Sequence, residues 1–228
     1  MISDAIFSQL KSMMREALSC SAHDISHGER VYQMACHLAE TEHADRDVIR
    51  AAAILHDIAR TKEDEDTTGA TDHAVLGAQM SRSILLSLGC PPEFAGRVSS
   101  AILKHRFKGG VAPETIEEKI IYDADKLDII GAVGIARSFM IAGQYGQLAY
   151  ANTNIDDYMM SNLVGGTKSG RIKDMKKHAP NIEFELKMKS IPNRLFTETA
   201  RRIAKERIKL MENFFAILKA DTEVNRDL

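Results

Sequence analysis

The sequence predicts an all-α protein. Apolar residues recur at helical spacing in one segment after another, aromatic residues are few, and Gly or Pro stands where several of these segments stop. With 228 residues, 44% of them hydrophobic, the chain can bury a full core as a single domain. We expect one helical domain, with a core over about residues 20–142 and a C-terminal helical extension over residues 143–228 packed on it.

The composition of the chain indicates which kinds of partner the protein is expected to bind. The formal net charge is −2, which gives no general basis for nucleic-acid binding. Cys20, Cys36 and Cys90 are odd in number and lack CxxC spacing, as expected of reduced thiols in a cytosolic protein. No apolar run approaches the roughly 20 residues of a membrane span, and the N-terminus carries no basic-then-apolar signal. We therefore expect a cytoplasmic protein without a membrane partner.

Two amphipathic helices open the chain. Residues 3–18 carry apolar side chains at helical spacing and are expected to pack on the domain. After a polar break, residues 29–42 show the same period, which places His27 in the first turn of the second helix. The first turn of a helix is a good place for a ligand.

The central predicted helix covers residues 45–59 and opens with acidic residues that suit a helix N-terminus. Its apolar run ends in His56 and Asp57. An isolated ionised carboxylate among apolar residues costs several kcal/mol or more, so Asp57 needs a cation, a proton or the surface within reach. A divalent metal supplies such a cation. The alternative is a His–Asp pair bonded to the backbone, and the second dipeptide His23-Asp24 shows that the dipeptide alone does not decide.

Two further histidines stand at predicted helix ends. Residues 61–72 form a polar acidic run without apolar periodicity, which indicates a loop beside the site. His73 begins the next helix, which stops at Gly89. The helix after it begins near Pro92 and ends at His105. Taken singly, each histidine could also be a solvated cap residue.

A cluster of carboxylates follows. Residues 114–125 are predicted to form a helix that ends in Asp125, with Asp123 and Asp128 as close neighbours. These carboxylates favour a local cation, and Lys126 is the positive charge inside the cluster. Residues 127–142 are predicted to continue as an apolar helix whose two glycines each cost roughly 1 kcal/mol in propensity, a cost that close helix packing would offset.

The C-terminal third is more polar. Residues 143–160 contain tyrosines and glutamines that could line a base or sugar pocket or pack in the core. The balance of residues 168–209 shifts towards Lys and Arg, which could guide an anionic substrate or form a solvated helix face. Residues 195–219 are predicted to form a long amphipathic closing helix.

The order His27, His56-Asp57, Asp125 resembles the HD superfamily of metal-dependent phosphohydrolases, whose H…HD…D pattern these residues match one by one. The segments at residues 24–31 and 122–137 resemble the small stand-alone HD hydrolases of bacteria and archaea, some of which act on nucleoside triphosphates. The resemblance runs from about residue 20 to the C-terminal helix. It departs between Ala179 and Asn193, which leaves substrate preference and oligomer contacts open.

The resemblance implies a helical HD-domain fold with one metal site at converging helix ends. Its implied ligands to one divalent ion are His27, His56, Asp57 and Asp125. A mixed N/O site with open positions suits Mn²⁺, Fe²⁺, Co²⁺, Ni²⁺ or Mg²⁺ more than a closed structural zinc. A second ion is possible, because histidines placed like His73 and His105 hold a second metal in some HD relatives and contact substrate phosphate in others.

The implied roles complete the expectation. Asp57 both holds metal and orients the attacking water, and His73, His105 and Lys126 stabilise the developing phosphate charge. Arg30 and Lys126 are candidates for binding the substrate phosphate. The alternative for Arg30 is an ion pair with Asp24 or another carboxylate, and the alternative for Lys126 is a salt bridge within its acidic cluster.

The expected function is divalent-metal-dependent hydrolysis of phosphate esters or anhydrides, with a nucleotide as the small phosphorylated substrate. Two other classes stay open: a di-iron HD-type oxygenase using the same ligands plus the two further histidines, and a non-catalytic metal-binding sensor. Nucleic-acid binding through the basic C-terminal stretch is the weakest alternative. An oligomer is compatible with the sequence.

Overall fold

The computed structural model describes residues 2–18, 25–106 and 112–223, and within these ranges the chain is helical throughout its regular structure. The one extended pairing in the described residues is an isolated antiparallel bridge between Leu163 and Ile172. The all-α prediction is therefore confirmed. No single described helix is long and apolar enough to cross a membrane, although the bent pair Ile116–Asp128 and Gly131–Gln144 passes the same test when taken together.

The chain divides into two compact units. The first comprises Met1–Asp128 with Leu195–Ala200, and the second comprises Ile129–Arg194 with Arg201–Leu228. Each unit has buried hydrophobic residues of its own. The packing of residues 143–228 on a core of residues 20–142 stays a prediction.

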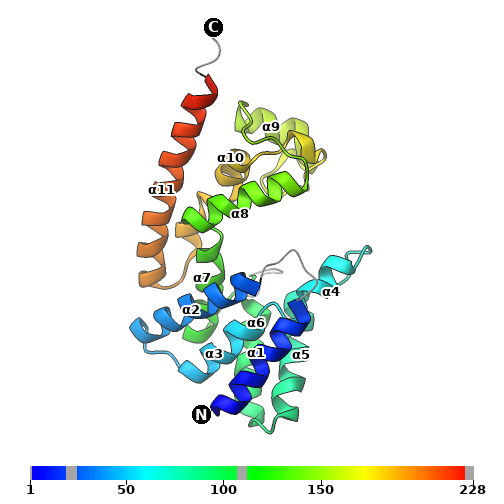
Figure 1. Cartoon of the computed structure of the whole chain (residues 1–228), viewed down its shortest axis with the longest axis vertical. Coiled ribbons are helices and arrows are strands. Elements are labelled where there is room, and N and C mark those ends of the chain that lie inside the picture. The colour runs from blue at the N-terminus through cyan, green and yellow to red at the C-terminus, as the bar shows by residue number, and fades with distance from the viewer. Residues whose placement is uncertain (1, 19–24, 107–111, 224–228) are drawn as a thin grey trace. The chain divides into compact units, whose positions relative to one another are not determined.

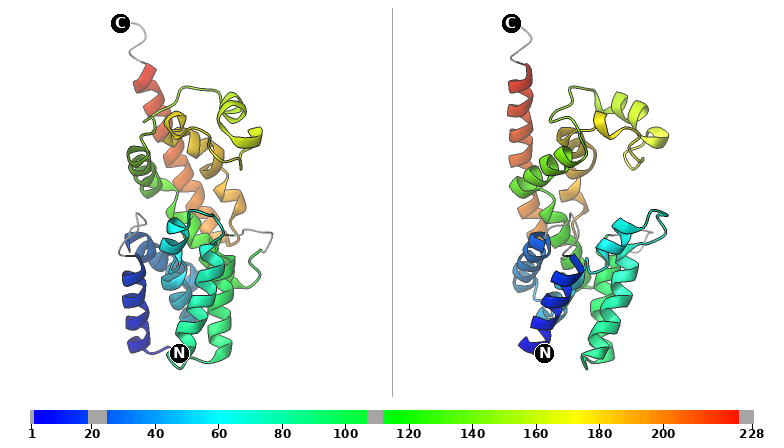
Figure 2. Two further views of the ribbon diagram at one scale, coloured as in Figure 1. Left: turned by 90° about the vertical axis from the view of Figure 1, so that its right-hand side faces the viewer. Right: turned by 45° about the vertical axis from the view of Figure 1, so that its right-hand side comes forward.

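The first unit is a set of packed helices (Figure 1). Helix α2 packs against α3 and α7, and α6 packs against α3, α5 and α7; Figure 2 shows α5 and α6 side by side. The helices of this unit are α1 (Asp4–Leu18), α2 (Ile25–Thr41), α3 (Arg46–Leu55), α4 (Arg60–Glu65), α5 (His73–Ser87), α6 (Pro92–Lys104) and α7 (Ile116–Asp128).

Helix α3 is the centre of this unit. The side chain of Asp45 caps its N-terminus by accepting hydrogen bonds from the backbone N–H groups of Asp47 and Val48, at 3.0 and 3.4 Å. Every residue from Ala51 to Leu55 is buried. Each fully buried Ile or Leu side chain contributes roughly 1.5–3 kcal/mol, so this helix fixes the backbone on which His56 and Asp57 follow.

Helix α7 is held at its start and again near its middle. At its start, Thr115 and Glu118 form a capping box: Glu118 N–H donates to Thr115 Oγ1 at 3.3 Å, and Thr115 N–H donates to Glu118 Oε2 at 3.1 Å. Further along, the fully buried carboxylate of Asp123 accepts hydrogen bonds from the backbone N–H groups of Phe196 and Thr197 and from the Thr197 hydroxyl. These bonds join residues 195–200 to the first unit and fix the helix that carries Asp125.

Three details of the predicted helices are wrong. The expected helix over residues 45–59 ends at Leu55, and residues 56–59 form a turn. The expected loop over residues 61–72 begins inside a short helix, α4. The expected continuous helix over residues 127–142 is broken, because α7 ends at Asp128 and α8 begins at Gly131, whose φ is +80°. A Cβ on Gly134 would lie 2.3 Å from the carbonyl oxygen of Ile129, so this glycine serves a close approach of the chain to itself.

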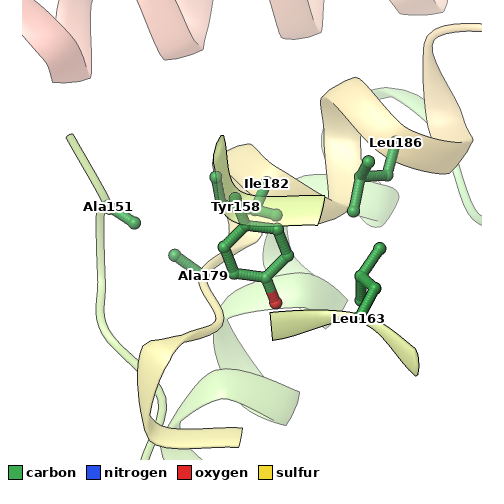
Figure 3. Packing of buried hydrophobic residues seen from close by; sticks show 6 residues of the cluster. All are labelled: Ala151, Tyr158, Leu163, Ala179, Ile182 and Leu186. Carbon is green, nitrogen blue, oxygen red and sulfur yellow. The ribbon is translucent and has the colours of Figure 1, made fainter. Parts of the chain in front are cut away.

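The second unit contains short helices and part of one long helix. Figure 3 shows its core, where Tyr158 and Leu163 pack with Ala179, Ile182 and Leu186. The long helix α11 confirms the predicted closing helix. The elements are α8 (Gly131–Gln144), α9 (Ile155–Asn162), η1 (Val164–Gly166), η2 (Met175–Lys177), α10 (Pro180–Glu183), the π-helical turn η3 (Phe184–Met188), η4 (Ile191–Arg194) and α11 (Glu198–Glu223), of which residues 198–200 belong to the first unit.

Candidate metal centre

The four predicted ligands come from three helices of the first unit. His27 lies in the first turn of α2, His56 caps the C-terminus of α3, Asp57 follows in the turn after it, and Asp125 lies in the last turn of α7. His27, His56 and Asp57 are buried, with 8% or less of each residue exposed. Helix ends therefore bring these residues together, as the sequence predicts.

The donor atoms have the spacing of a metal site. One nitrogen or oxygen from each of His27, His56 and Asp57 lies within 4.8 Å of the others. The Nε2 atoms of the two histidines are 3.4 Å apart, and each lies 3.6 Å from Asp57 Oδ2. Asp125 Oδ1 joins them at 3.5 Å from His27 Nε2. Donors that each sit roughly 2.0–2.2 Å from an ion stand about 3–4 Å apart, so this set fits a divalent cation.

Both histidines are oriented by their other ring nitrogen. His27 Nδ1 donates to Asp128 Oδ2 at 2.7 Å, and His56 Nδ1 donates to the carbonyl oxygen of Ala53 at 2.8 Å. With Nδ1 protonated, each Nε2 keeps its lone pair towards the centre. Such hydrogen bonds from ligating histidines to carboxylate or carbonyl oxygens are a regular feature of metal sites.

A second donor group shares Asp57. His73 Nε2 lies 3.2 Å from Asp57 Oδ1 and 3.2 Å from His105 Nε2, while His105 Nε2 lies 3.7 Å from the same carboxylate oxygen. Asp57, His73 and His105 thus form a second set that could hold a metal ion. The two carboxylate oxygens of Asp57 face different groups: Oδ2 faces the first, and Oδ1 faces the second.

The second pair of histidines is oriented in the same way. His105 Nδ1 donates to the carbonyl oxygen of Ile102 at 2.6 Å, and His73 Nδ1 donates to Glu63 Oε2 at 2.5 Å. Glu63 in turn accepts from Arg60 and Arg106, at 2.9 Å each. Glu63 therefore joins one histidine of the site to two cationic side chains.

The electrostatics of the centre keep the carboxylates of Asp57 and Asp125 ionised and the imidazole of His105 neutral. Burial opposes the charged form of Asp57, but the charge of His56 and the hydrogen bond from His73 hold its pKa well below the usual value. Burial likewise opposes the charge of Asp125, which Lys126 and His27 outweigh, so its pKa also lies well below the usual value. Burial and the nearby charge of His56 lower the pKa of His105 to about 3.

His27 behaves differently. Burial disfavours its charged form, but hydrogen bonds with Asp125 and Asp128 outweigh burial and raise its pKa to about 9. This raised pKa places a positive charge on His27, next to the carboxylates of Asp125 and Asp128. A divalent ion placed among the same donors would take over that role and release the proton.

The two predicted phosphate contacts are engaged by carboxylates. Arg30 makes a two-pronged pair with Asp128, with Nε donating to Oδ1 at 2.6 Å and Nη2 donating to Oδ2 at 3.0 Å. Lys126 Nζ lies 2.5 Å from Asp125 Oδ2. Asp24, the other partner considered for Arg30, lies outside the described residues. The substrate contacts of Arg30 and Lys126 stay predictions.

Four residues of the centre were not predicted as site residues: Arg60, Glu63, Arg106 and Asp128. Asp128 orients His27, and its signal was its place one turn after Asp125 on the same helix. Glu63 and Arg106 left no such signal, because one lies in an acidic run and the other beside a turn. Their roles depend on contacts between residues 43 positions apart, which helical periodicity does not encode.

Comparison with known proteins agrees with this geometry. Residues 24–130 match the model of the HD domain family. The chain is also 31% identical over 219 residues to the uncharacterized protein YpgQ of Bacillus subtilis, covering 93% of this chain and 92% of YpgQ. Residues 24–130, which match the family model, contain all four predicted ligands as well as His73 and His105.

Solved structures show the same fold. YpgQ of Bacillus subtilis in complex with ADP superposes with a TM-score of 0.71 at 28% identity, covering 98% of each chain. A predicted HD superfamily hydrolase from an uncultured Thermotogales bacterium gives a TM-score of 0.63 at 30% identity, covering 94% of this chain and 91% of that one. An HD-superfamily hydrolase from Bacillus thuringiensis gives 0.71 at 25% identity, covering 97% and 99%. The chain belongs to the HD superfamily of hydrolases.

Proposed function

We propose that this protein is a divalent-metal-dependent phosphohydrolase that acts on nucleotides. The observation that carries the proposal is the pair of buried donor groups that share Asp57, in a chain of a hydrolase superfamily. His27, His56, Asp57 and Asp125 would hold the first ion, and Mn²⁺, Fe²⁺, Co²⁺, Ni²⁺ and Mg²⁺ all suit this mixed N/O set. Such an ion supplies charge stabilisation at phosphate oxygens and a lowered pKa for bound water.

The chain's own residues then position the substrate and the water. Asp57 carries one carboxylate oxygen on each side of the centre, so it can accept a hydrogen bond from the attacking water and fix its direction towards phosphorus. His73 and His105 face Asp57 Oδ1 with Nε2, where the two rings would hold a second ion; their other predicted role, donation to phosphate oxygens, needs a proton on Nε2 as well. Lys126, beside Asp125, adds positive charge where negative charge develops on the phosphate.

The preference for nucleotides has two supports. The related protein YpgQ was solved in complex with ADP. In this chain, residues 168–209 are rich in Lys and Arg, a distribution that favours the approach of anionic substrates. We expect faster release of phosphate or pyrophosphate from nucleoside mono- or triphosphates than from small sugar phosphates.

A substrate panel tests the proposal. Purified protein loaded with Mn²⁺, Co²⁺ or Ni²⁺ is offered nucleoside mono-, di- and triphosphates, cyclic nucleotides and sugar phosphates, and the products are separated. Orthophosphate from a monophosphate indicates phosphomonoesterase chemistry, and pyrophosphate from a triphosphate indicates attack at the α-phosphorus. Asp57→Asn is the inactive control. Faster hydrolysis of sugar phosphates or cyclic nucleotides with all three metals would contradict the nucleotide preference while leaving the hydrolase intact.

The second donor group supports one competing activity. A di-iron oxygenase needs two ions that share a carboxylate, and Asp57 with its two histidine groups offers such an arrangement. Two irons per chain together with oxygen consumption would favour this activity over hydrolysis. Metal binding without turnover of any phosphate compound or oxygen would favour a sensing role.

A further inference from the structure

The second unit contains a cavity of about 290 Å³ that the metal centre does not use. One wall is a single face of α8, where Gly134, Arg137, Ser138 and Ile141 follow at helical spacing. The opposite wall comes from the stretch around Ile172 and from α10 and η3. The volume is close to the lower end of ligand pockets, which span roughly 300–1,000 Å³.

A buried polar network fixes the second wall. Tyr158 donates its hydroxyl proton to His178 Nδ1 at 2.7 Å, and His178 Nε2 donates to Glu183 Oε2 at 3.2 Å. Asn162 donates its side-chain amide to Tyr158 at 3.0 Å and to the carbonyl oxygen of Asp174 at 3.0 Å. Both His178 nitrogens are thereby engaged, so its ring is a rigid wall element. Figure 3 shows Tyr158 inside the apolar cluster that supports this network.

The backbone of the same wall contains a π-helical turn. Residues Phe184–Met188 adopt this rare form directly after α10, and both Lys187 and Met188 line the cavity. Single π-helical turns occur frequently at functional sites. Lys187 Nζ lies 2.9 Å from Glu183 Oε1, so the one carboxylate among the lining residues is already paired.

The lining suits a flat ring that is attached to a negatively charged group. Ile129, Ile141 and Ile172 give apolar surfaces, and Met175 and Met188 add thioether sulfurs, which make favourable contacts with aromatic rings. Gln147 contributes an amide that both donates and accepts hydrogen bonds, as recognition of a base edge requires. The cationic side chains of Arg137 and Lys187 outnumber the carboxylates of the lining.

We infer that this cavity binds the nucleobase part of a nucleotide; the choice of a nucleotide rests on the proposed function. Of the polar and aromatic residues over 143–160 that the sequence suggests for a base pocket, Gln147 lines this cavity. Tyr158 instead packs in the core and supports the wall. The nucleotide is either the substrate itself or a second molecule that regulates the protein.

Calorimetric binding of adenosine and ADP, measured with a chelator present, tests the inference without metal or hydrolysis. Ile141→Trp fills the cavity from its rim, since Ile141 is 45% exposed. Met140→Trp is the matched control, because Met140 neighbours it, is 70% exposed and lies outside the lining. Thermal unfolding of all proteins verifies that they are folded. We expect Ile141→Trp to weaken adenosine binding at least tenfold, Met140→Trp to change it less than twofold, and Gln147→Leu to alter the ratio of adenosine to cytidine affinity.

Steady-state kinetics then show whether the bound base belongs to the substrate or to a regulatory nucleotide. If it belongs to the substrate, Ile141→Trp raises KM for nucleotides and leaves kcat unchanged. If it belongs to a regulator, adenosine binding is lost while KM stays the same; both results support a nucleobase site. The inference is overturned if wild-type protein binds neither adenosine nor ADP at millimolar concentration, or if Ile141→Trp binds them as tightly as Met140→Trp. A failure of the proposed function would give a different result: nucleotides would bind normally but would not be hydrolysed with any metal.

Discussion

Replacing Asp128 tests whether the residues behind the ligands tune metal binding. Three charge-assisted hydrogen bonds converge on this carboxylate, one from His27 and two from Arg30, at 2.6–3.0 Å. Asn at this position keeps the shape but offers one acceptor oxygen, so it loses the two-pronged pair with Arg30 or the bond that orients His27. Partners of this kind typically change metal affinity by about 10–100-fold, which corresponds to roughly 1.4–2.7 kcal/mol.

The assay is titration of Mn²⁺ into metal-free protein by calorimetry. We expect Asp128→Asn to raise the Mn²⁺ dissociation constant by about 10–100-fold. Glu29→Gln is the control on α2, the helix of His27 and Arg30, because Glu29 is exposed and its ion pair with Arg15 is a surface pair worth roughly 0–1 kcal/mol. Wild-type affinity in a folded Asp128→Asn protein would refute the role given to this carboxylate.

Three further predictions concern the ligands, the anchor of α7 and the pH dependence of stability. Asp57→Ala and Asp125→Ala should each abolish stoichiometric metal while leaving the helical signal in circular dichroism intact; full metal retention in both, by elemental analysis, would contradict the site. Asp123→Ala orphans buried donors of residues 196–197 and should lower the free energy of unfolding by about 3 kcal/mol in urea titrations, so a loss below 1 kcal/mol would contradict the anchor. Burial opposes the charge of Glu118, but hydrogen bonds from Ser100 and the Glu114 backbone, followed by Lys104, lower its pKa below 4.5. Its contribution is therefore present above pH 4.5 and lost as the pH falls, and Glu118→Gln should flatten the acid decline of stability, whereas an unchanged decline would contradict this account.

Helical periodicity predicted most elements of the first unit. The apolar spacing of residues 45–59 identified the central helix, although α3 ends at Leu55 and His56 and Asp57 follow it. The helix ends where His56 and Asp57 join the candidate centre, because the backbone turns at these two residues. Caps, glycines and prolines were enough to predict these helices, because helices are encoded by short-range sequence patterns.

The metal centre was predictable in part. The four candidate ligands were predicted from their order along the chain, and the structure places the donors of His27, His56 and Asp57 together, with Asp125 beside His27. Metal binding by these residues stays a prediction. The hydrogen bonds behind them were not predictable, because they join residues distant in sequence: His27 and Asp128 are 101 positions apart. The ion pairs of Arg30 and Lys126 were among the alternatives that the sequence left open, since a cation beside carboxylates suits a substrate or a neighbour equally well.

The structure of the second unit could be predicted from the sequence only to a small extent. Residues 143–194 fold into short helical pieces held by polar networks such as that of Tyr158, His178 and Glu183. Short pieces lack a sustained apolar period, and the π-helical turn has no periodic signature. The cavity of this unit therefore emerged from the arrangement of side chains in space and from no motif.

Phosphorus NMR of nucleotides incubated with Mn²⁺-loaded protein tests metal-dependent nucleotide hydrolysis most directly, because substrate and product phosphates are seen in one experiment. Orthophosphate or pyrophosphate is expected to accumulate with wild-type protein, to stop when a chelator is added and to be absent with Asp57→Ala. Nucleotides that remain intact with protein shown to contain stoichiometric metal would contradict the proposed hydrolysis.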